Sequence, residues 1–209
     1  MESALRAWAA GPDLRLIETL AWDGENLLNL DLHLTRLLSS AARLGWPCDP
    51  LAVVEALRAS ARSATRARLR LTLGASGSLV VEPSSMPPAK PVWQVGLAHQ
   101  RLSSADIWLS LKSNKRHAYD AARATLPKDL DELILQNERG EVCDGTITTV
   151  FFDRGDGLRT PPLTSGVLPG VLRAKLNPPE EVLLVKHLAD VQIWVGNSLR
   201  GLMRAEFRG

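Results

Sequence analysis

The sequence predicts an α+β protein of two domains, and three observations support this prediction. Segments in which apolar and polar residues alternate are joined by short turns rich in glycine, asparagine or aspartate, as in β-hairpins. Two segments of the first half, 31–44 and 50–61, repeat their apolar residues with the period of an amphipathic helix. A proline-rich stretch over 83–91 disfavours both helix and central strand. We therefore expect a smaller N-terminal α+β domain over 1–85, a linker over 86–91 and a larger C-terminal domain over 92–209.

The first half is expected to open with a strand and a helix. The segment Leu14–Trp22 reads as a strand, and the Asp23-Gly24 pair has the chemistry of a hairpin turn. Asp31 is the expected N-cap of a helix that runs to Leu44, and Gly45 is expected to end it. The predicted inward stripe of this helix is Leu34, Leu37, Leu38, Ala41 and Leu44.

A second helix and a second hairpin complete the first half. Asp49 is the expected N-cap of the second helix, because Pro50 can take the first helical position, where a missing N–H costs nothing. Its predicted inward residues are Leu51, Val54, Leu57 and Ala61. Over 66–71, arginines alternate with apolar residues, which predicts a half-buried strand with a basic face, and the turn at 75–78 returns the chain along 79–82.

The second half is expected to consist mainly of strands. The predicted strands are 92–98, 107–111, 132–137, 141–146, 148–152 and 191–196, and a helix is predicted over 118–126. A short helix is expected to begin near Gly170, with Pro169 beside its first turn. Backbone amides at such a helix start can bind a phosphate group.

The composition restricts the classes of partner. A net charge of +2 gives no broad electrostatic reason to expect nucleic acid or an anionic membrane, although a small anionic ligand fits. Cys48 and Cys143 lack metal-type spacing, which favours reduced thiols over a disulfide framework and predicts no metal site. The segment from Met1 to Leu14 has only short apolar pieces, so we expect no secretory or membrane-spanning segment and a cytoplasmic protein.

Lys112 is the candidate catalytic residue. It ends the apolar run 107–111 and precedes a helical pattern, so its backbone would be anchored while its side chain reaches into a cleft. Partial desolvation would lower the pKa of the amine toward that of a usable nucleophile. The alternative is that residues 112–117 form a solvated basic turn, which is the more frequent origin of such a pattern.

Further groups downstream extend this hypothesis. Asp144 lies on a predicted strand, the helix start at Gly170 offers backbone amides, and Ser198 lies in a small polar loop. Pyridoxal phosphate needs an amine for its aldehyde, an anion beside its ring nitrogen, and amides and hydroxyls for its phosphate. Periodicity alone does not select this cofactor over a phosphorylated sugar.

Arg36 is a candidate ligand in the first half. It directly precedes Leu37 of the apolar stripe, so its stem could follow a buried surface while its guanidinium reaches a ligand. An exposed arginine is the more frequent explanation of this pattern. His33, on the same helix, is expected to be a packed or capping residue.

The order of short motifs along the chain resembles that of the class IV aminotransferase family. The motifs are Ile17-Glu18-Thr19, His33-Leu34-Thr35-Arg36-Leu37, Ser40-Ala41, Leu44-Gly45, Lys112, Arg116, Tyr119-Asp120, Asp131-Glu132, Gly140, Gly145-Thr146, Thr160-Pro161-Pro162-Leu163, Gly166-Val167-Leu168-Pro169-Gly170-Val171-Leu172-Arg173 and Asn197-Ser198-Leu199-Arg200-Gly201. The resemblance covers nearly the whole chain. It implies a two-domain fold-type IV, D-amino acid aminotransferase-like architecture with pyridoxal phosphate in the interdomain cleft, and a homodimer acting on a small-molecule amine.

The resemblance also implies roles for single residues. Lys112 would be the Schiff-base lysine and Arg36 a phosphate ligand. Val171 and Leu172 would supply phosphate-binding backbone amides, and Ser198 a further phosphate contact.

Two positions depart from the family pattern. Asp144 stands where the family normally has a glutamate against the pyridine nitrogen; it keeps the charge but is one methylene shorter. Thr149, a further candidate cofactor-binding residue, stands where many members have asparagine. These departures leave a slowed or repurposed enzyme open.

Within the family, the chain is most similar to the aminodeoxychorismate lyases. The segment from Lys112 to Asp120 resembles their Lys-Thr-Thr-x-Arg-x-x-Tyr-Asp pattern, and 197–201 resembles their Asn-Ser-x-Arg-Gly. The resemblance implies conversion of 4-amino-4-deoxychorismate to 4-aminobenzoate and pyruvate, a reaction of folate biosynthesis. Transamination between amino and keto acids, and a catalytically idle homologue that binds the cofactor, are the alternatives.

Overall fold

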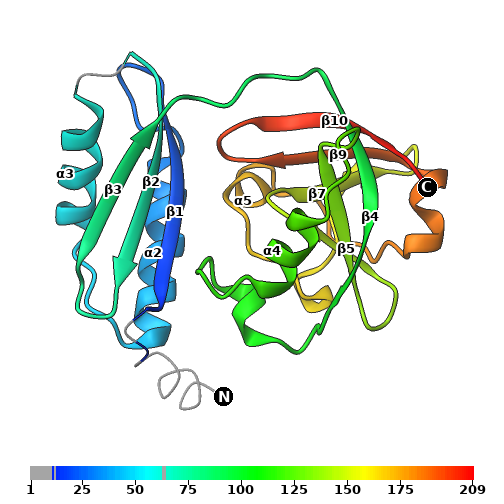
Figure 1. Cartoon of the computed structure of the whole chain (residues 1–209), viewed down its shortest axis with the longest axis horizontal. Helices are drawn as coiled ribbons and strands as arrows, with labels where there is room; N and C mark the ends of the chain where they lie inside the picture. Colours follow the sequence, from blue (N-terminus) through cyan, green and yellow to red (C-terminus); the bar gives the residue numbers. More distant parts are fainter. Residues whose placement is uncertain (1–10, 12, 63–64) are drawn as a thin grey trace. The chain divides into compact units, whose positions relative to one another are not determined.

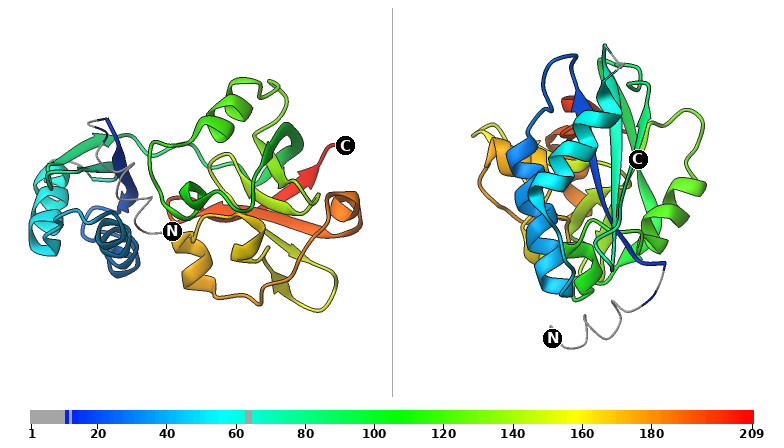
Figure 2. Two further views of the ribbon diagram at one scale, coloured as in Figure 1. Left: turned by 90° about the horizontal axis from the view of Figure 1, so that it is seen from below. Right: turned by 90° about the vertical axis from the view of Figure 1, so that its left-hand side faces the viewer.

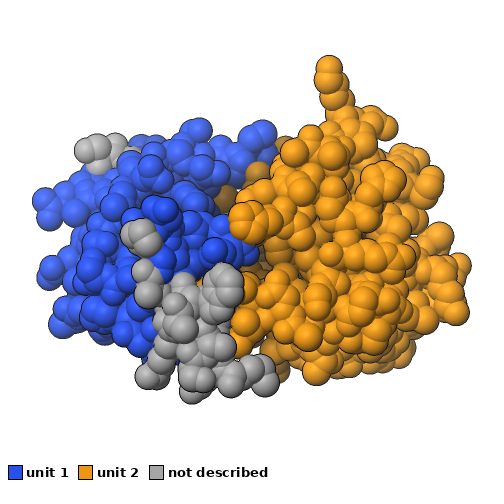
Figure 3. All heavy atoms as spheres, turned by 60° about the horizontal axis from the view of Figure 1, so that its bottom comes forward, with its two compact units in different colours: residues 1–88, 111–115 blue, residues 89–110, 116–209 orange. Residues whose placement is uncertain are grey.

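The computed structural model describes residue 11 and residues 13–62 and 65–209. The chain forms two compact units, which Figure 3 shows in different colours. Unit 1 comprises the chain up to Pro88 together with Leu111–Lys115, and unit 2 comprises Ala89–Ser110 and Arg116–Gly209. The expectation about a secretory or membrane-spanning N-terminus concerns residues that lie mostly outside the described part. Among the described residues, no helix is both long and apolar enough to cross a membrane.

Unit 1 is a three-stranded antiparallel sheet in the order β1-β2-β3 with two helices on one face. Its elements are β1 (Arg15–Trp22), α2 (Leu30–Leu44), α3 (Pro50–Ala61), β2 (Ala67–Gly74) and β3 (Leu79–Ser84). The right-hand view of Figure 2 shows both helices in front of the sheet. Leu20, Leu69, Leu71 and Leu73 of the strands and Leu37 and Leu57 of the helices are almost fully buried and form the core of this unit.

The local signals of unit 1 explain most of its elements. The Asp23 carboxylate accepts hydrogen bonds from the backbone N–H groups of Glu25 (2.9 Å) and Asn26 (2.7 Å), which closes the predicted turn after β1. Gly45 ends α2 in the left-handed conformation (φ 72°), as expected. The predicted N-cap was wrong: Asn29 caps α2 with a φ of 54°, and Asp31 lies in the first turn, where its charge still favours the helix dipole.

The second helix has the predicted ends, and Leu57 and Ala61 of its predicted inward face are buried. The Asp49 side chain accepts a hydrogen bond from the Leu51 N–H (2.9 Å), and Pro50 opens the helix, as expected. Leu51 was predicted to point inward, but 73% of it is exposed. Val53, Leu57 and Ala61 are the buried residues, because their i, i+4, i+8 spacing faces the sheet.

Unit 2 contains a seven-stranded sheet in the order β6-β5-β4-β10-β9-β7-β8. Figure 1 labels β4, β5, β7, β9 and β10 of this sheet. An additional pairing of β6 with β7 closes six of these strands into a ring. The strands are β4 (Val92–Leu102), β5 (Glu132–Asn137), β6 (Val142–Gly145), β7 (Thr149–Asp153), β8 (Leu158–Arg159), β9 (Gln192–Asn197) and β10 (Gly201–Phe207). Strand β4 runs parallel to both β5 and β10, and the other pairs are antiparallel.

Two helices and three 3-10 turns surround this sheet. They are η1 (Ile107–Ser110), α4 (His117–Ala124), η2 (Leu163–Ser165), α5 (Val171–Leu176) and η3 (Val185–Asp190). One apolar cluster, which includes Phe152, Val150 and Val195, fills one side of the sheet. A second cluster joins Tyr119 and Ala122 of α4 to Leu135 and Cys143 of β5 and β6. The mixture of helices and sheets confirms the predicted α+β class.

One predicted strand of the second half was wrong. Residues 107–111 alternate like a strand, but Ile107–Ser110 form a 3-10 helix. The Asp106 side chain accepts a hydrogen bond from the Trp108 N–H (2.9 Å), and its carbonyl accepts one from the Leu109 N–H (3.2 Å). These local bonds fix a tight turn, which an alternating pattern of only five residues cannot exclude.

Candidate active site

The segment that carries Lys112 is anchored to the edge of β1 in unit 1. The Lys112 carbonyl accepts a hydrogen bond from the Ile17 N–H (2.8 Å), and Ser113 forms a bridge with Leu16. Asn114 adds a bond from its N–H to the Arg15 carbonyl (3.1 Å). Lys112 itself is half-buried, and the residues that follow Arg116 begin α4. The lysine backbone is therefore anchored, as expected. It is held by backbone hydrogen bonds to β1, and not because it ends a strand.

In unit 2, Asp144 and Thr149 lie opposite each other in the β6–β7 pair. Only 4% of Asp144 is exposed, and its Oδ2 accepts a hydrogen bond from the Leu168 N–H (2.7 Å). Thr149 is also buried. A buried carboxylate that is oriented by a backbone amide is suited to face a cationic group of a ligand.

The turn between these two residues is held by Glu132, which the sequence did not single out as a site residue. Glu132 is fully buried at the start of β5. Its Oε1 accepts hydrogen bonds from the N–H and hydroxyl of Thr146 (N–H at 3.0 Å). Its Oε2 accepts from the Ile147 N–H (3.1 Å) and the Thr148 hydroxyl (2.9 Å). The sequence did contain a signal for this role, namely a glutamate at the start of an apolar strand that is followed later in the chain by a Thr-x-Thr turn.

The start of α5 packs closely against Thr149 and β9. A Cβ on Gly170 would lie 2.7 Å from the Thr149 Oγ1, and one on Gly196 would lie 2.5 Å from the Leu172 Cδ2. The first N–H donated within α5 is that of Ala174, to the Gly170 carbonyl (2.9 Å). The amides of Val171 and Leu172 precede it and have no acceptor within the helix. The helix start that carries these two amides therefore lies against Thr149.

The turn that carries Ser198 is tied to the same region. Asn197 ends β9, and its Oδ1 accepts hydrogen bonds from the N–H groups of Leu199 (3.1 Å) and Arg200 (3.0 Å). Its Nδ2 donates to the Ile147 carbonyl (3.1 Å) in the turn held by Glu132. Asn197 therefore joins the two turns that follow β6 and β9. Five of the predicted residues, namely Asp144, Thr149, Val171, Leu172 and Ser198, belong to this region of unit 2.

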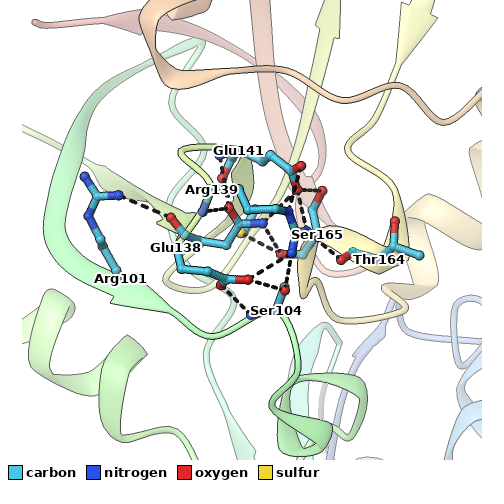
Figure 4. Close-up of polar contacts among 9 residues, drawn as sticks. Arg101, Ser104, Glu138, Arg139, Glu141, Thr164 and Ser165 are labelled. Atoms are coloured by element: carbon cyan, nitrogen blue, oxygen red, sulfur yellow. Dashed lines mark hydrogen bonds and ion pairs between the residues drawn. The ribbon is translucent and has the colours of Figure 1, made fainter.

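The loop before α5 is fixed by the β5–β6 hairpin, as Figure 4 shows. Arg139 donates to Glu141 (2.7 and 2.9 Å) and to the Thr164 carbonyl (3.0 Å). The Ser165 hydroxyl donates to Glu141 (2.8 Å), and the hydrogen bonds from Arg139 lower the pKa of this glutamate to about 2. The network therefore stays ionised at neutral pH and holds the start of the segment that leads to Leu168 and α5.

Tyr119 is a second residue that the sequence did not assign to the site. Its hydroxyl is buried and has no hydrogen-bond partner among the described residues. Burial raises the pKa of the phenol well above its usual value, and the nearby charge of Asp144 raises it further. Tyr119 is therefore a neutral donor in the surroundings of Asp144.

Arg36 lies in unit 1, as does Lys112. Its Nε donates to the Glu18 Oε1 (2.8 Å), and its Nη2 donates to the Glu18 Oε2 (2.6 Å). The side chain of Arg36 is only 10% exposed, so the frequent explanation of a solvated arginine does not apply. His33 is packed, as expected, and also contacts Glu18.

The described residues contain no group of three or more histidine, cysteine or acidic side chains that could hold a metal ion. Both cysteines are free thiols. The Cys143 thiol is buried and donates to the Ser165 carbonyl (3.1 Å), and its burial raises its pKa. Cys143 is thus a packing residue beside Asp144 and not a reactive thiol.

The sequence matches the family described as amino-transferase class IV over residues 15–206. The chain belongs to the class IV aminotransferase family. The resemblance drawn from the motifs is therefore confirmed. The family consists of pyridoxal-phosphate-dependent enzymes, and the chain is an enzyme of this class.

Individual relatives include both reaction types of the family. A Schizosaccharomyces pombe protein named "Putative aminodeoxychorismate lyase" is 31% identical over 169 residues, which are 77% of this chain and 72% of the relative. The crystal structure of a "Putative amino-acid aminotransferase" from Mesorhizobium loti is 42% identical with a TM-score of 0.90, and the match covers 94% of this chain and all of that one. The 4-amino-4-deoxychorismate lyase of Pseudomonas aeruginosa has the same fold, with a TM-score of 0.83 and 21% identity over 92% of this chain and 82% of its own.

Proposed function

We propose that this class IV enzyme converts 4-amino-4-deoxychorismate to 4-aminobenzoate and pyruvate with pyridoxal phosphate as cofactor. The observation that carries the proposal is the similarity to the S. pombe protein named as a lyase of this substrate, which extends over most of both chains. The lyase-like pattern from Lys112 to Asp120 agrees with it. The homodimer, the cytoplasmic location and the lack of a nucleic-acid or membrane partner remain parts of the same proposal.

The residues of unit 2 fit the cofactor chemically. Pyridoxal phosphate has a basic ring nitrogen and a dianionic phosphate, so its site requires an anion and a set of donors. Asp144 supplies a buried carboxylate, and the amides of Val171 and Leu172 with the hydroxyl of Ser198 supply the donors. The close approach of Gly170 to Thr149 supports this fit, because it brings the start of α5 against strand β7. Thr149 is proposed as a further cofactor contact.

The residues of unit 1 complete the proposed set. Arg36 would bind the phosphate, since a guanidinium matches phosphate geometry, and Lys112 would hold the aldehyde. When bound, the cofactor supplies an electron sink for the negative charge that forms at the substrate α-carbon. The negative charge of Asp144 would keep the ring nitrogen protonated and so strengthen that sink.

Lys112 is proposed to move the proton. Its Nζ would accept the α-proton of the substrate as a general base. A positioned general base contributes about 10²- to 10⁴-fold to a rate. The anchoring of the Lys112 carbonyl to the Ile17 N–H supports this role, because it fixes the backbone from which the side chain reaches.

The test measures pyruvate release from aminodeoxychorismate by the wild-type protein, by Lys112→Ala and by Lys115→Ala. Lys115 is exposed and close in sequence, so its variant is the matched control. We expect turnover and a borohydride-sensitive yellow absorbance in the wild type and in Lys115→Ala, and neither in Lys112→Ala. Full turnover by Lys112→Ala, or none by the wild type, would overturn the proposal.

Transamination is the second candidate function, and the 42% identity with the M. loti protein favours it. Incubation with paired amino and keto acids separates the two, because only transamination forms pyridoxamine phosphate. The catalytically idle homologue, which the residues at 144 and 149 left open, is not proposed, because the chain belongs to a family of enzymes.

A further inference from the structure

Three side chains of unit 1, those of Glu18, His33 and Arg36, are buried in contact with one another and form a triad. Glu18 lies on β1, and His33 and Arg36 lie one turn apart on α2. The His33 Nδ1 is 2.6 Å from the Glu18 Oε2, and Arg36 donates to both Glu18 oxygens. The side-chain exposures of Glu18, His33 and Arg36 are 3%, 2% and 10%.

The charge states of this triad follow from its contacts. Burial alone would raise the pKa of Glu18, but the charge of Arg36 and the hydrogen bonds from Arg36 and His33 outweigh burial and lower the pKa to about 2. An ionised carboxylate only accepts hydrogen bonds, so the His33 Nδ1 must carry a proton. The His33 Nε2 is buried without a hydrogen-bond partner among the described residues, beside a narrow cavity lined by Leu34, Val53 and Leu57.

The contacts fix the direction of the Arg36 guanidinium. An arginine on a helix surface normally samples many rotamers, and ordering it costs about 2 kcal/mol of side-chain entropy. Here the ordering is provided by two parallel hydrogen bonds to Glu18, and Glu18 is itself oriented by His33. The guanidinium has five N–H donors, and Glu18 accepts two of them.

A buried ion pair of this kind contributes little to stability in general, because desolvation offsets the Coulomb attraction. Apolar residues of similar volume often serve the fold equally well. A fully buried glutamate between a histidine and an arginine is therefore better explained by a need for a fixed arginine than by a need for stability.

We propose that Glu18 and His33 are positioning residues, which orient the guanidinium of Arg36 toward the phosphate group of the cofactor. This inference rests on the proposed function. Glu18 aligns the guanidinium plane through two hydrogen bonds, and His33 prevents the Glu18 carboxylate from rotating. Neither residue contacts the phosphate in this account, so both act through Arg36.

The experiment compares two ligands that differ only in the phosphate. Apoprotein is titrated with pyridoxal phosphate and with pyridoxal, and binding is followed by tryptophan fluorescence of the six tryptophans. The variants are Glu18→Gln, His33→Ala, His33→Asn and Arg36→Ala, and Glu82→Gln is the matched control because Glu82 is an exposed glutamate of the same sheet. Thermal unfolding of each apoprotein reports whether the variant folds.

We expect Glu18→Gln to weaken pyridoxal phosphate binding about 10- to 100-fold, as loss of an outer-shell partner does at metal sites. The affinity for pyridoxal should change less than about threefold, since that ligand has no phosphate for Arg36 to bind. His33→Ala should weaken phosphate-dependent binding as well, and His33→Asn should restore it, because the asparagine amide can donate to Glu18 in place of the Nδ1–H. Glu18→Gln combined with Arg36→Ala should bind no more weakly than Arg36→Ala alone.

Three outcomes separate the inference from the function it rests on. If the wild type does not bind pyridoxal phosphate, the proposed function fails. If Arg36→Ala lowers the preference for the phosphorylated ligand but Glu18→Gln and both His33 variants do not, the inference alone is wrong. Equal losses of affinity for both ligands would show that the triad serves folding and would also overturn the inference. Should Glu18→Gln fail to fold, the comparison of His33→Ala with His33→Asn decides between these outcomes.

Discussion

Asp144 and Thr149 are direct partners across the antiparallel strands β6 and β7, and the turn between them is bound by one buried carboxylate, that of Glu132. By the resemblance of the motifs, each of these two paired residues stands where the family pattern has a different residue. The shorter aspartate is oriented by the Leu168 N–H, and the threonine lies against Gly170 at the start of α5. Asp144 and Thr149 therefore lie in one contiguous part of unit 2.

Replacing Asp144 by asparagine tests the role of its charge. Asparagine has nearly the same shape and can still accept the hydrogen bond from the Leu168 N–H, so the fold should keep its stability. Without the anion, turnover should fall about 10²-fold or more, because stabilisation of charge at the reaction centre is lost. Steady-state rates with thermal unfolding as the control check this result. An Asp144→Asn enzyme with wild-type turnover would contradict the proposed role.

Replacing Asp144 by glutamate tests the missing methylene. The charge is kept, so we expect turnover to stay within about tenfold of the wild type, at a loss of about 1–3 kcal/mol in the free energy of unfolding because the site is only 4% exposed. Urea unfolding and turnover are measured on the same preparation. A loss of turnover as large as that of Asp144→Asn would show that position, and not charge alone, governs the residue.

Glu132→Gln should disrupt the turn that separates Asp144 and Thr149. The glutamine amide group would face the N–H or hydroxyl donors of residues 146–148, so at least one buried donor loses its acceptor. We expect a loss of about 2–3 kcal/mol in unfolding free energy and weaker cofactor binding. Asp129→Asn is the control, since Asp129 is exposed in the same unit. Unchanged stability in urea would show that Glu132 is not the support of this turn.

The sequence predicted those elements whose signals are local. The turn at Asp23-Gly24, the Asp49 cap, the Gly45 end and the strand Glu132–Asn137 all appear as expected. The errors arose where a short pattern of apolar residues is compatible with two local structures or two helix faces. Residues 107–111 alternate like a strand, but Ile107–Ser110 form a 3-10 helix, which the hydrogen bond from the Trp108 N–H to the Asp106 side chain stabilises. In α3, Leu57 and Ala61 are buried as predicted, but Val54 was chosen as the inward residue instead of Val53, because the two valines are equally apolar.

The site was predicted less completely, for a physical reason. Motifs identified Asp144, Thr149 and the start of α5, which the structure brings together in unit 2. Glu132, Tyr119 and Glu18 were not assigned a role, because each acts through its burial and its partners, which a single sequence does not display. Glu18 is separated from Arg36 by 18 residues, and only the packing of α2 on β1 brings them into contact.

Gly196→Ala tests the close packing of β9 against α5. A Cβ there would lie 2.5 Å from both the Gly201 carbonyl oxygen and the Leu172 Cδ2, so backbone must move. We expect a loss of about 1–3 kcal/mol in stability and weaker binding of pyridoxal phosphate, because the Leu172 amide shifts. Gly96→Ala is the control: its Cβ would meet the flexible end of Leu130 at 2.6 Å, which can turn away. Equal binding by both variants would contradict the assigned position of α5.

Acid titration tests the charge of Glu18 independently of any cofactor. The pKa of Glu18 is about 2 in the folded protein and 4.5 for an ordinary glutamate, mainly because Arg36 and His33 stabilise the ionised form against burial. Because the pKa of Glu18 is lower in the folded than in the unfolded protein, its ionisation stabilises the fold at any pH above the unfolded-state pKa. This stabilisation is about 3 kcal/mol in full, and it is lost as the pH falls toward 2. Apoprotein should therefore be more stable than Glu18→Gln at pH 7 in urea unfolding. The gap should stay constant down to about pH 5 and narrow steadily below it, while Glu82→Gln follows the wild type throughout. A gap that stays constant down to about pH 3 would mean that Glu18 is not ionised in the folded protein in the way its contacts require.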